Sequence, residues 1–424
     1  MPLPHTLRSL RHQNFRRYYI GQTVSQLGSW MQSTAVMWLA YRLTESTAAT
    51  GMIGFLAMVP YIFITPLAGA LSDRVSRQKL LTVVLSLSIV MSTLLWALTF
   101  TQHITIVWLA VLAFVQGILN GVEVPIRHAF FVQLIEDRED LPNAIALNSI
   151  SINSTRLVGP AIGGLLIAAL GEAACFGLNA ISYLAVLIQL RRISPNEGVR
   201  KKNTAGLFAD LIEGWRFGLS HPVIRPLVLT VGAVSFAVSP YVVLMPAIAV
   251  QTFGKGAALN GLFISSVGLG ALAGAILLAR RRNVRGLTGW LWMTGSLAAI
   301  GSIGFSFSRN EWLSFLCMAI TGMGLMGTSA TVNTIVQSIV EDDMRGRVVS
   351  IYSTFFIGAA PLGHLGAGWL AEHIGAPYTF TVCGLLCAAA IGGYALYLPK
   401  LRAHLRPIYL QRGIIPATPG ETDQ

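Results

Sequence analysis

A membrane-length stretch from Asn143 to Gly164 carries a full positive charge, Arg156, together with three asparagines and several hydroxyl groups. A charge in the middle of a bilayer costs at least about 2.5–3.5 kcal/mol unless an acidic partner, a water-filled cavity or an anionic ligand stabilises it. Arg156 lies about 15 residues into the stretch, hence roughly 22 Å from one membrane surface. We therefore expect this helix to face protein or a cavity, with Arg156, Asn148 and Asn153 contacting a bound substrate.

Glu123 is the acidic residue that lies most plainly within an apolar stretch, and Arg127 follows it four residues later. A carboxylate in a low-dielectric setting takes up a proton more readily than one in water. Glu123 is therefore a candidate proton carrier, with Arg127 as its partner in coupling. The alternative is a purely structural ion pair between residues i and i+4 of one helix.

Two further sets of polar side chains recur at steps of three and four residues, which places each set on one face of a helix. We expect these faces to line a cavity, with Gln22, Gln26 and Asn120 contacting substrate. Hydrogen bonding between helices is the alternative that the pattern leaves open. The two sets are Gln22, Gln26, Ser29 and Ser33 in the first apolar stretch, and Gln116, Asn120, Glu123 and Arg127 in the fourth.

The composition indicates a membrane protein. The chain of 424 residues is 54% hydrophobic and 11% charged, whereas soluble domains are about one quarter charged. Long apolar runs recur from Ile20 to Leu398, and because roughly 20 apolar residues cross a bilayer as a helix, about twelve spans account for the chain. We therefore expect an all-α membrane protein with about twelve transmembrane helices in two pseudo-symmetric six-helix bundles.

The net charge of +12 would suit a protein that binds nucleic acid, but the positions of the charges argue against this. Only Arg42, Lys255 and Arg309 lie in loops on one side of the predicted membrane, whereas the opposite loops and the two tails hold most of the 30 lysines and arginines. Cytoplasmic loops carry such an excess. We expect both termini to be cytoplasmic, a location in a bacterial inner membrane, and no nucleic-acid partner.

An internal repeat predicts the domain organisation. Several short motifs recur at a nearly constant offset, which suggests a duplicated six-helix unit with the substrate site between its copies. The recurring motifs are Leu67–Ala70 and Leu272–Ala275, Val132-Gln133 and Val336-Gln337, and Gly171 and Gly375. The predicted parts are an N-terminal bundle over 1–192, a cytoplasmic linker over 193–221, a C-terminal bundle over 222–399, and a cytoplasmic tail over 400–424 without regular structure.

The sequence offers no pattern for a cofactor or for catalysis. The four cysteines lie inside apolar segments without metal-ligand spacing. A nucleotide-binding loop of the form Gly-x-x-x-x-Gly-Lys-Ser/Thr is missing from the sequence, and so is any cluster of a nucleophile with a base. We expect neither a metal nor a cofactor, and no enzymatic activity.

Three motifs resemble those of a known family. The loop after the second span resembles the signature loop of the major facilitator superfamily, with Ser76 in place of its usual second glycine. A motif in the fifth span resembles one typical of the antiporters of this superfamily, and a motif in the fourth resembles the enterobactin-exporter and macrolide-efflux branch. In order, the motifs are Gly69-x-x-x-Asp73-Arg74-x-Ser76-Arg77-x-Lys79, Gly159-Pro160-x-x-Gly163-Gly164 and Glu123-x-Pro125-x-Arg127.

The resemblance implies a gate at the loop between the second and third spans. There Asp73 would face the N-terminal end of a later helix that begins near Arg345–Val348, and this contact would latch one access state. Gly69, Arg74 and Arg77 belong to the same loop. The alternative is that its basic residues only set the orientation in the membrane.

The glycines of the fifth span indicate a second gate. Gly159, Gly163 and Gly164 would let a neighbouring helix approach closely, and Pro160 would bend the helix and free a backbone carbonyl. In a transporter this would make a packed outer seam that stops leakage. Tight packing without any gating role is the alternative.

We therefore predict a monomeric secondary transporter that works by alternating access. Export of amphipathic small molecules, drug-like or siderophore-like, against an inward flow of protons is the first hypothesis, with the substrate, protons and the lipid bilayer as its partners. Uptake or flipping of a lysolipid, a sugar or another solute is the main alternative. A non-transporting sensor, whose segment 194–221 would bind a partner, is a remote one.

Overall fold

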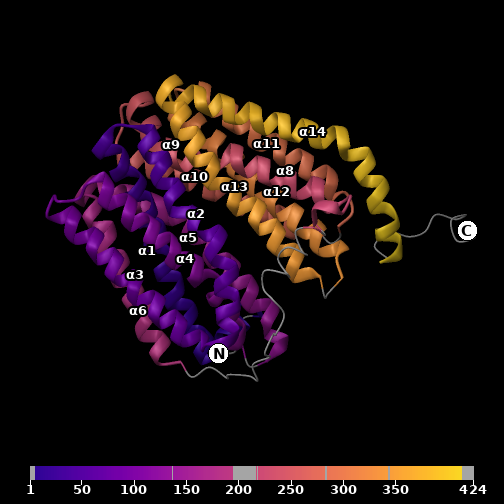
Figure 1. Cartoon of the computed structure of the whole chain (residues 1–424), viewed down its shortest axis with the longest axis horizontal. Coiled ribbons are helices and arrows are strands. Elements are labelled where there is room, and N and C mark those ends of the chain that lie inside the picture. Colours follow the sequence, from indigo (N-terminus) through magenta and orange to yellow (C-terminus); the bar gives the residue numbers. More distant parts are fainter. Residues whose placement is uncertain are drawn as a thin grey trace, which may run out of the picture. The chain divides into compact units, whose positions relative to one another are not determined.

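The computed structural model describes residues 5–135, 137–193, 216, 218–281, 284–341 and 344–412, without the side chains of residues 5, 6, 70, 72–74, 138, 345 and 347. Within these ranges every regular element is a helix (Figure 1). The elements are η1 (His5–Arg11), α1 (Gln13–Thr44), α2 (Thr47–Arg74), α3 (Arg77–Phe100), α4 (Ile106–Gln133), η2 (Arg138–Asp140), α5 (Leu141–Leu170), α6 (Glu172–Arg191), α8 (Ile224–Val238), α9 (Tyr241–Ala247), η3 (Ile248–Thr252), α10 (Ala257–Ala279), α11 (Leu287–Phe307), α12 (Glu311–Ile339), α13 (Arg345–Ile374) and α14 (Ala376–Gln411).

The prediction of an all-α membrane protein is confirmed. Among the described residues, 11 helices are long and apolar enough to cross a membrane, and one of them is the run Ile224–Thr252 formed by α8, α9 and η3. Helix α1 has 32 residues, about 48 Å at 1.5 Å per residue, and is therefore also long enough to span. Its glutamines and arginines make it more polar than the others. With α1, the described helices supply the predicted set of membrane-length segments.

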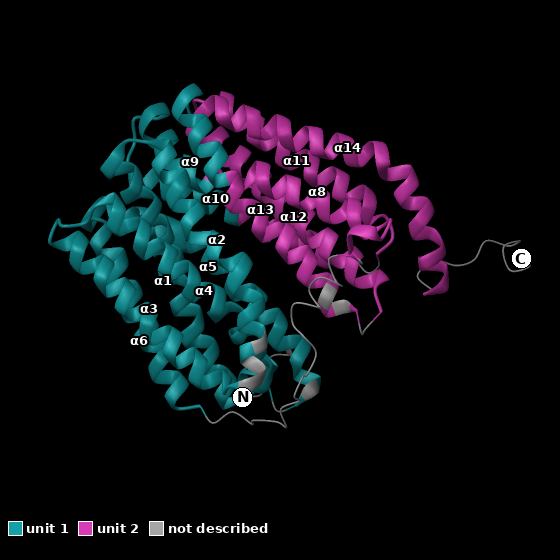
Figure 2. Ribbon diagram, in the orientation of Figure 1, with its two compact units in different colours: residues 1–204, 242–268, 364–376 teal, residues 205–241, 269–363, 377–424 magenta. Residues whose placement is uncertain are grey.

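The chain forms two compact units, shown in different colours in Figure 2. Unit 1 comprises residues 1–204, 242–268 and 364–376, and unit 2 comprises residues 205–241, 269–363 and 377–424. Unit 1 therefore contains the first six long helices together with three later pieces: the run from α9 into η3, the first half of α10 and the last turns of α13.

An apolar core lies in unit 1 near the N-terminal end of α1. Phe15, Tyr18 and Phe130 are almost fully buried. The rings of Tyr18 and Phe130 lie 5.4 Å apart with an edge-to-face geometry, and those of Phe15 and Phe131 lie at the same distance in the same geometry. Such aromatic pairs add stability beyond the area they bury. They fix α1 against α4, the two helices that carry the polar faces predicted from the sequence.

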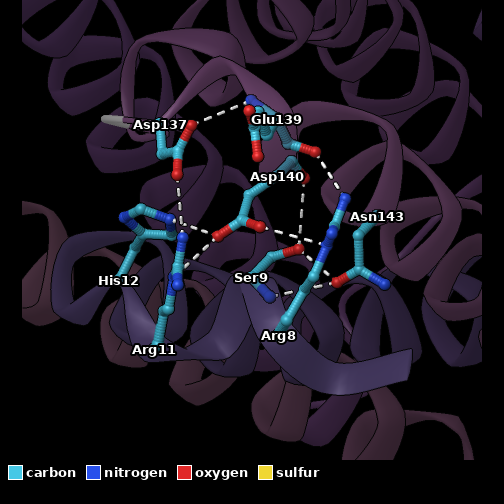
Figure 3. Close-up of polar contacts among 8 residues, drawn as sticks. All are labelled: Arg8, Ser9, Arg11, His12, Asp137, Glu139, Asp140 and Asn143. Carbon is cyan, nitrogen blue, oxygen red and sulfur yellow. Dashed lines mark hydrogen bonds and ion pairs between the residues drawn. The ribbon is translucent and has the colours of Figure 1, made fainter. Parts of the chain in front are cut away.

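The short helix η1 is held to the start of α5 by an ion-pair cluster around Asp140 (Figure 3). The carboxylate of Asp140 is buried and lies 3.1 Å from Arg8 Nε, 2.8 Å from Arg11 Nε and 2.8 Å from His12 Nε2. The side-chain oxygen of Asn143 accepts hydrogen bonds from the backbone N–H and the hydroxyl of Ser9. The arginine-rich N-terminus is thus held by an acidic residue of η2 and an asparagine of α5.

The charges around Asp140 change its acidity. Burial raises the pKa of the Asp140 carboxyl group, but the hydrogen bond from His12 and the charges of Arg11 and Arg8 outweigh burial and hold that pKa below its usual range. A carboxyl group whose folded-state pKa is lowered contributes stability above its ordinary pKa of about 4, and this contribution is lost as the pH falls through the folded value.

We predict that Asp140→Asn lowers the melting temperature of the purified protein at pH 7, because Arg8, Arg11 and His12 lose the carboxylate that they share. The titration of Asp140 itself should leave the difference in melting temperature between variant and native protein constant from pH 8 to pH 5. Below about pH 4 this difference should shrink. Thermal unfolding followed by intrinsic fluorescence measures it. Asp137→Asn is the matched control, since the side chain of Asp137 is 44% exposed and pairs with Arg11 at 2.9 Å, and it should have the smaller effect. Equal effects of the two variants would contradict the central role of Asp140.

The expectation that the tail lacks regular structure is wrong for residues 400–411. Helix α14 continues to Gln411 and includes both Pro399 and Pro407. Leu401, Leu405 and Tyr409 are buried at steps of four residues, so one apolar face of the extension packs against unit 2. Residues 413–424, and most of the segment 194–221 on which the sensor hypothesis depends, lie outside the described residues.

Candidate transport site

An open cavity of about 390 Å³ is lined by residues of α1, α2, α4 and α5 in unit 1. It gathers six of the residues that the sequence predicts for substrate binding and coupling: Gln22, Gln26, Asn120, Glu123, Arg127 and Arg156. The remaining lining residues are Ser29, Trp30, Ser33, Tyr61, Val124 and Ile152. Residues more than 130 positions apart in the sequence therefore meet in one polar space.

Arg156 lines this cavity from α5 and lies against α1. Its guanidinium carbon is 5.4 Å from the centre of the Trp30 ring, a distance at which the ring face attracts a cation. Such a contact is worth about 0.5–2 kcal/mol, more when water is excluded. The charge is therefore partly stabilised by an aromatic face beside the cavity.

Glu123 and Arg127 form an ion pair on α4. Arg127 Nη1 lies 3.0 Å from Glu123 Oε1, and the two side chains are 18% and 7% exposed, respectively. The i,i+4 pair that the sequence left as a structural alternative is thus present, and it also lines the cavity. Removing one partner of a buried pair is strongly destabilising because the other charge is left uncompensated. Protonation of Glu123 would have the same electrical effect on Arg127.

The polar faces of α1 and α4 line the cavity and also form hydrogen bonds, the two alternatives that the sequence left open. Gln26 Oε1 accepts a hydrogen bond from Thr155 at 3.4 Å, and Ser29 shares one with Tyr183 at 3.1 Å. Within α4, Gln116 donates to Asn120 at 3.0 Å. The faces therefore connect neighbouring helices as well as lining the cavity.

The structure does not bring Asn148 and Asn153 to the cavity. Asn153 donates to the carbonyl of Ser149 in its own helix at 2.8 Å, and neither asparagine is among the lining residues. Helix α5 presents Ile152 and Arg156 to the cavity instead, one turn apart. Binding roles for Asn148 and Asn153 stay a prediction.

The sequence analysis missed two aromatic residues of this site. Trp30 and Tyr61 line the cavity, but an aromatic side chain in an apolar helix usually indicates core packing or lipid contact. One feature of the sequence could have indicated Trp30: it is the neighbour of Ser29, which belongs to the polar face of α1. Tyr61 follows Pro60 in α2, and no pattern distinguished it.

The glycines of α5 allow close helix packing on two sides. A Cβ atom added at Gly159 would lie 2.5 Å from Trp30 Cβ, and one at Gly163 would lie 3.1 Å from Met31 Cα, both on α1. On the other side, a Cβ at Gly164 would lie 2.5 Å from the Ala257 carbonyl oxygen of α10. Helix α5 is thus packed between α1 and α10, with Pro160 inside it. A gating role for this seam stays a prediction.

The loop motif is only partly described. Gly69 lies on α2 with no atom within 4 Å of an added Cβ, and Arg77 begins α3 and donates to the Ala129 carbonyl of α4 at 3.3 Å. The side chains of Asp73 and Arg74 lie outside the described residues, so the latch that the motif implies stays a prediction. Among the described residues, no group of three or more His, Cys, Asp or Glu side chains is placed to bind a metal.

We predict that Gly261→Ala destabilises the protein, because the added Cβ would lie 2.2 Å from the Pro160 carbonyl oxygen and 2.9 Å from Gly164 Cα. Backbone atoms cannot move aside cheaply, and overpacking of this kind costs about 1–3 kcal/mol. Thermal unfolding in detergent measures the loss. Gly366→Ala is the matched control, since no atom lies within 4 Å of its added Cβ, and a melting temperature that fell equally in both variants would contradict the close contact.

Membrane-length helices around a cavity with buried charges define a membrane transporter, and comparison with known proteins gives the family. Residues 5–410 match the family described as transmembrane secretion effector. The chain belongs to this family, within the major facilitator superfamily, as its motifs indicated. Its fold and its relatives are those of transporters and not of enzymes.

Several curated relatives are transporters by name. The chain is 24% identical to the staphyloferrin A transporter of Staphylococcus aureus, covering 85% of this chain and 90% of that protein. It is 25% identical to the enterobactin exporter EntS of Salmonella typhimurium (90% and 93% covered) and 26% identical to the multidrug efflux pump Tap of Mycolicibacterium fortuitum (88% and 93%). The chain is therefore a multi-pass membrane transporter.

Solved structures agree on the fold. A variant of the nucleoside transporter NupG superposes with a TM-score of 0.72 at 10% identity, covering 90% of this chain and 99% of that one. A bacterial homologue of the lysosomal transporter Spinster gives a TM-score of 0.72 at 13% identity, covering 91% and 96%. At such identities the likeness concerns the fold alone.

Proposed function

We propose that this protein exports amphipathic small molecules, drug-like or siderophore-like, in exchange for protons by alternating access. The observation that supports this most is the cavity in unit 1, which joins Arg156 and Trp30 to the Glu123–Arg127 ion pair. The names of the relatives, which include two siderophore transporters and a drug pump, support the substrate class.

The lining chemistry suits a molecule with a polar and an apolar part. Arg156 offers hydrogen-bond donors and a positive charge to acceptor groups of the substrate, while Trp30 and Tyr61 offer ring faces to its apolar part. Gln22 and Asn120 add amide groups that both donate and accept. Polar groups that converge on one pocket orient a ligand and supply specificity.

Coupling to protons would depend on Glu123. A carboxylate binds a proton or accepts a hydrogen bond from a substrate, and competition between the two is what exchange requires. When Glu123 is protonated its ion pair with Arg127 is lost, and Arg127 becomes available to rearrange the pocket. Proton binding and substrate binding would then exclude each other, as reciprocal linkage demands of an antiporter.

The arginine-rich N-terminus and the basic loops on its side favour an orientation with both termini in the cytoplasm of a bacterium. In this orientation the end of unit 1 where α1 joins α2 faces the outside. We also propose that the protein acts as a monomer, with bundles over 1–192 and 222–399 that rock against each other around the site.

The test is transport into inverted membrane vesicles. A panel of catecholate and carboxylate siderophores and amphipathic drugs is offered to vesicles with an imposed pH gradient, acidic inside. Uptake that depends on the protein and collapses with a protonophore supports proton-coupled export. A compound that accumulates undiminished with the gradient abolished would contradict the proposed coupling, and one that accumulates only in right-side-out vesicles would contradict the proposed direction.

Arg156→Ala should reduce transport by at least about tenfold while membrane insertion and melting temperature stay near those of the native protein, because the anchoring charge at the cavity is removed. Initial uptake rates in the vesicle assay measure it. Arg156→Lys keeps the charge but loses the planar group that stacks on Trp30, and should retain an intermediate rate. Native rates in Arg156→Ala would exclude this residue from the site.

Glu123→Gln should abolish the response of transport to the pH gradient while exchange of substrate for substrate continues, because the amide cannot take up the proton. Uptake with and without the gradient, and counterflow into preloaded vesicles, measure the two properties separately. Glu172→Gln is the matched control: Glu172 is also buried and also pairs with an arginine, Arg42, at 2.6 Å, but it lies outside the cavity. A full gradient response in Glu123→Gln would rule out its coupling role.

A further inference from the structure

One carboxylate oxygen near the end of α13 accepts four hydrogen bonds from the start of α2, all within unit 1. Glu372 Oε2 lies 2.8 Å from the backbone nitrogen of Thr47 and 3.1 Å from that of Ala48. The same oxygen lies 2.9 Å from the hydroxyl of Ser46 and 3.1 Å from that of Thr47. We call this contact the Glu372 clasp.

The clasp completes the cap of α2. The first backbone N–H groups of a helix have no partner within the helix, and Ser46 satisfies only that of Ala49, at 3.1 Å. Glu372 supplies the acceptor for Thr47 and Ala48. A negative charge at a helix N-terminus is also favoured by the helix dipole, and charge-assisted hydrogen bonds are stronger than neutral ones.

Below the clasp, α2 and α13 touch backbone to backbone. A Cβ atom added at Gly51 would lie 2.6 Å from the His364 carbonyl oxygen, and one added at Gly368 would lie 2.6 Å from Gly51 Cα. Thr50, between the clasp and this contact, is fully buried. Separating the two helices here therefore breaks the four hydrogen bonds of the clasp and exposes Thr50.

We propose that Glu372 is a positioning residue of the transport cycle, which holds the end of unit 1 where α1 joins α2 in its closed state. Helices α2 and α13 come from opposite halves of the chain, and alternating access requires the two halves to part at one end and then at the other. The inference rests on the transport function and on the orientation proposed above, by which this end faces the outside.

The clasp mirrors the latch that the sequence implies at the opposite end of the same helix pair. There Asp73, near the end of α2, is expected to face the start of α13 at Arg345–Val348. Here Glu372, near the end of α13, caps the start of α2. If the expected Asp73 latch forms, each closed state would have its own helix-capping contact, and opening one end while closing the other would exchange one cap for the other.

The experiment uses a cysteine reporter at Thr50. Thr50→Cys is introduced into the full chain, and right-side-out vesicles are treated with a membrane-impermeant maleimide. The four native cysteines are buried, and the native protein provides the blank. Initial labelling rates are compared in the background of Glu372→Ala, Glu372→Gln and Glu45→Gln. Glu45 is an exposed acid at the same end of the unit that takes no part in the clasp.

Glu372→Ala should raise the labelling rate by about tenfold, as expected for the loss of charge-assisted hydrogen bonds. Glu372→Gln keeps an acceptor oxygen without the charge and should raise it less, by about threefold. Glu45→Gln should leave it unchanged. A second reporter, Ser88→Cys, lies fully buried on α3 and should stay unlabelled in all backgrounds, which separates opening of this end from general unfolding.

Unchanged labelling in both Glu372 variants would overturn the proposal, and so would equal rises at Thr50 and Ser88. If Glu372→Ala fails to fold, Glu372→Gln alone decides. Labelling needs neither substrate nor a proton gradient, so its outcome is independent of whether proton-coupled export is correct. A rise seen only in inverted vesicles would reverse the proposed orientation and leave the clasp standing.

Discussion

The structure depends on the compensation of charge in a medium that cannot solvate it. Within the membrane-length helices of unit 1, Arg156, Glu123 and Arg127 line one cavity, and each has a partner from the protein: the Trp30 ring for Arg156, and each other for the ion pair. Burying three charges in a small unit is tolerable only because they share a polar space. In the proposed function, a proton or a substrate would act on this site by changing that charge balance.

Close backbone contact is the second constraint, and it locates the rigid seams of unit 1. Gly164 against α10 and Gly51 against Gly368 bring helices together at distances that a side chain would prevent. Two helices in such close contact are either packed together or separated, and intermediate arrangements are disfavoured. A polar contact placed at the rim of such a seam, like that of Glu372, can therefore influence the choice between the arrangements.

The comparison of sequence and structure shows where helical periodicity is a sufficient guide. Gln22, Gln26, Asn120 and Glu123 were assigned to a cavity from steps of three and four residues, and all of them line it. Asn153, which polarity alone suggested, is not among the residues that line this cavity, and its binding role stays a prediction. Trp30 was missed because an aromatic ring in an apolar helix is typical of packing as well as of binding.

The sequence by itself determined the class of protein: the length of the apolar runs predicted a helical membrane protein, because a bilayer imposes helix length on any chain that crosses it, and the motifs that resemble the major facilitator superfamily indicated a transporter. Tertiary structure decided which partners meet. The Trp30 face beside Arg156 and the cap that Glu372 places on α2, more than 320 residues away, depend on contacts between distant helices, and local periodicity carries no information about such pairings.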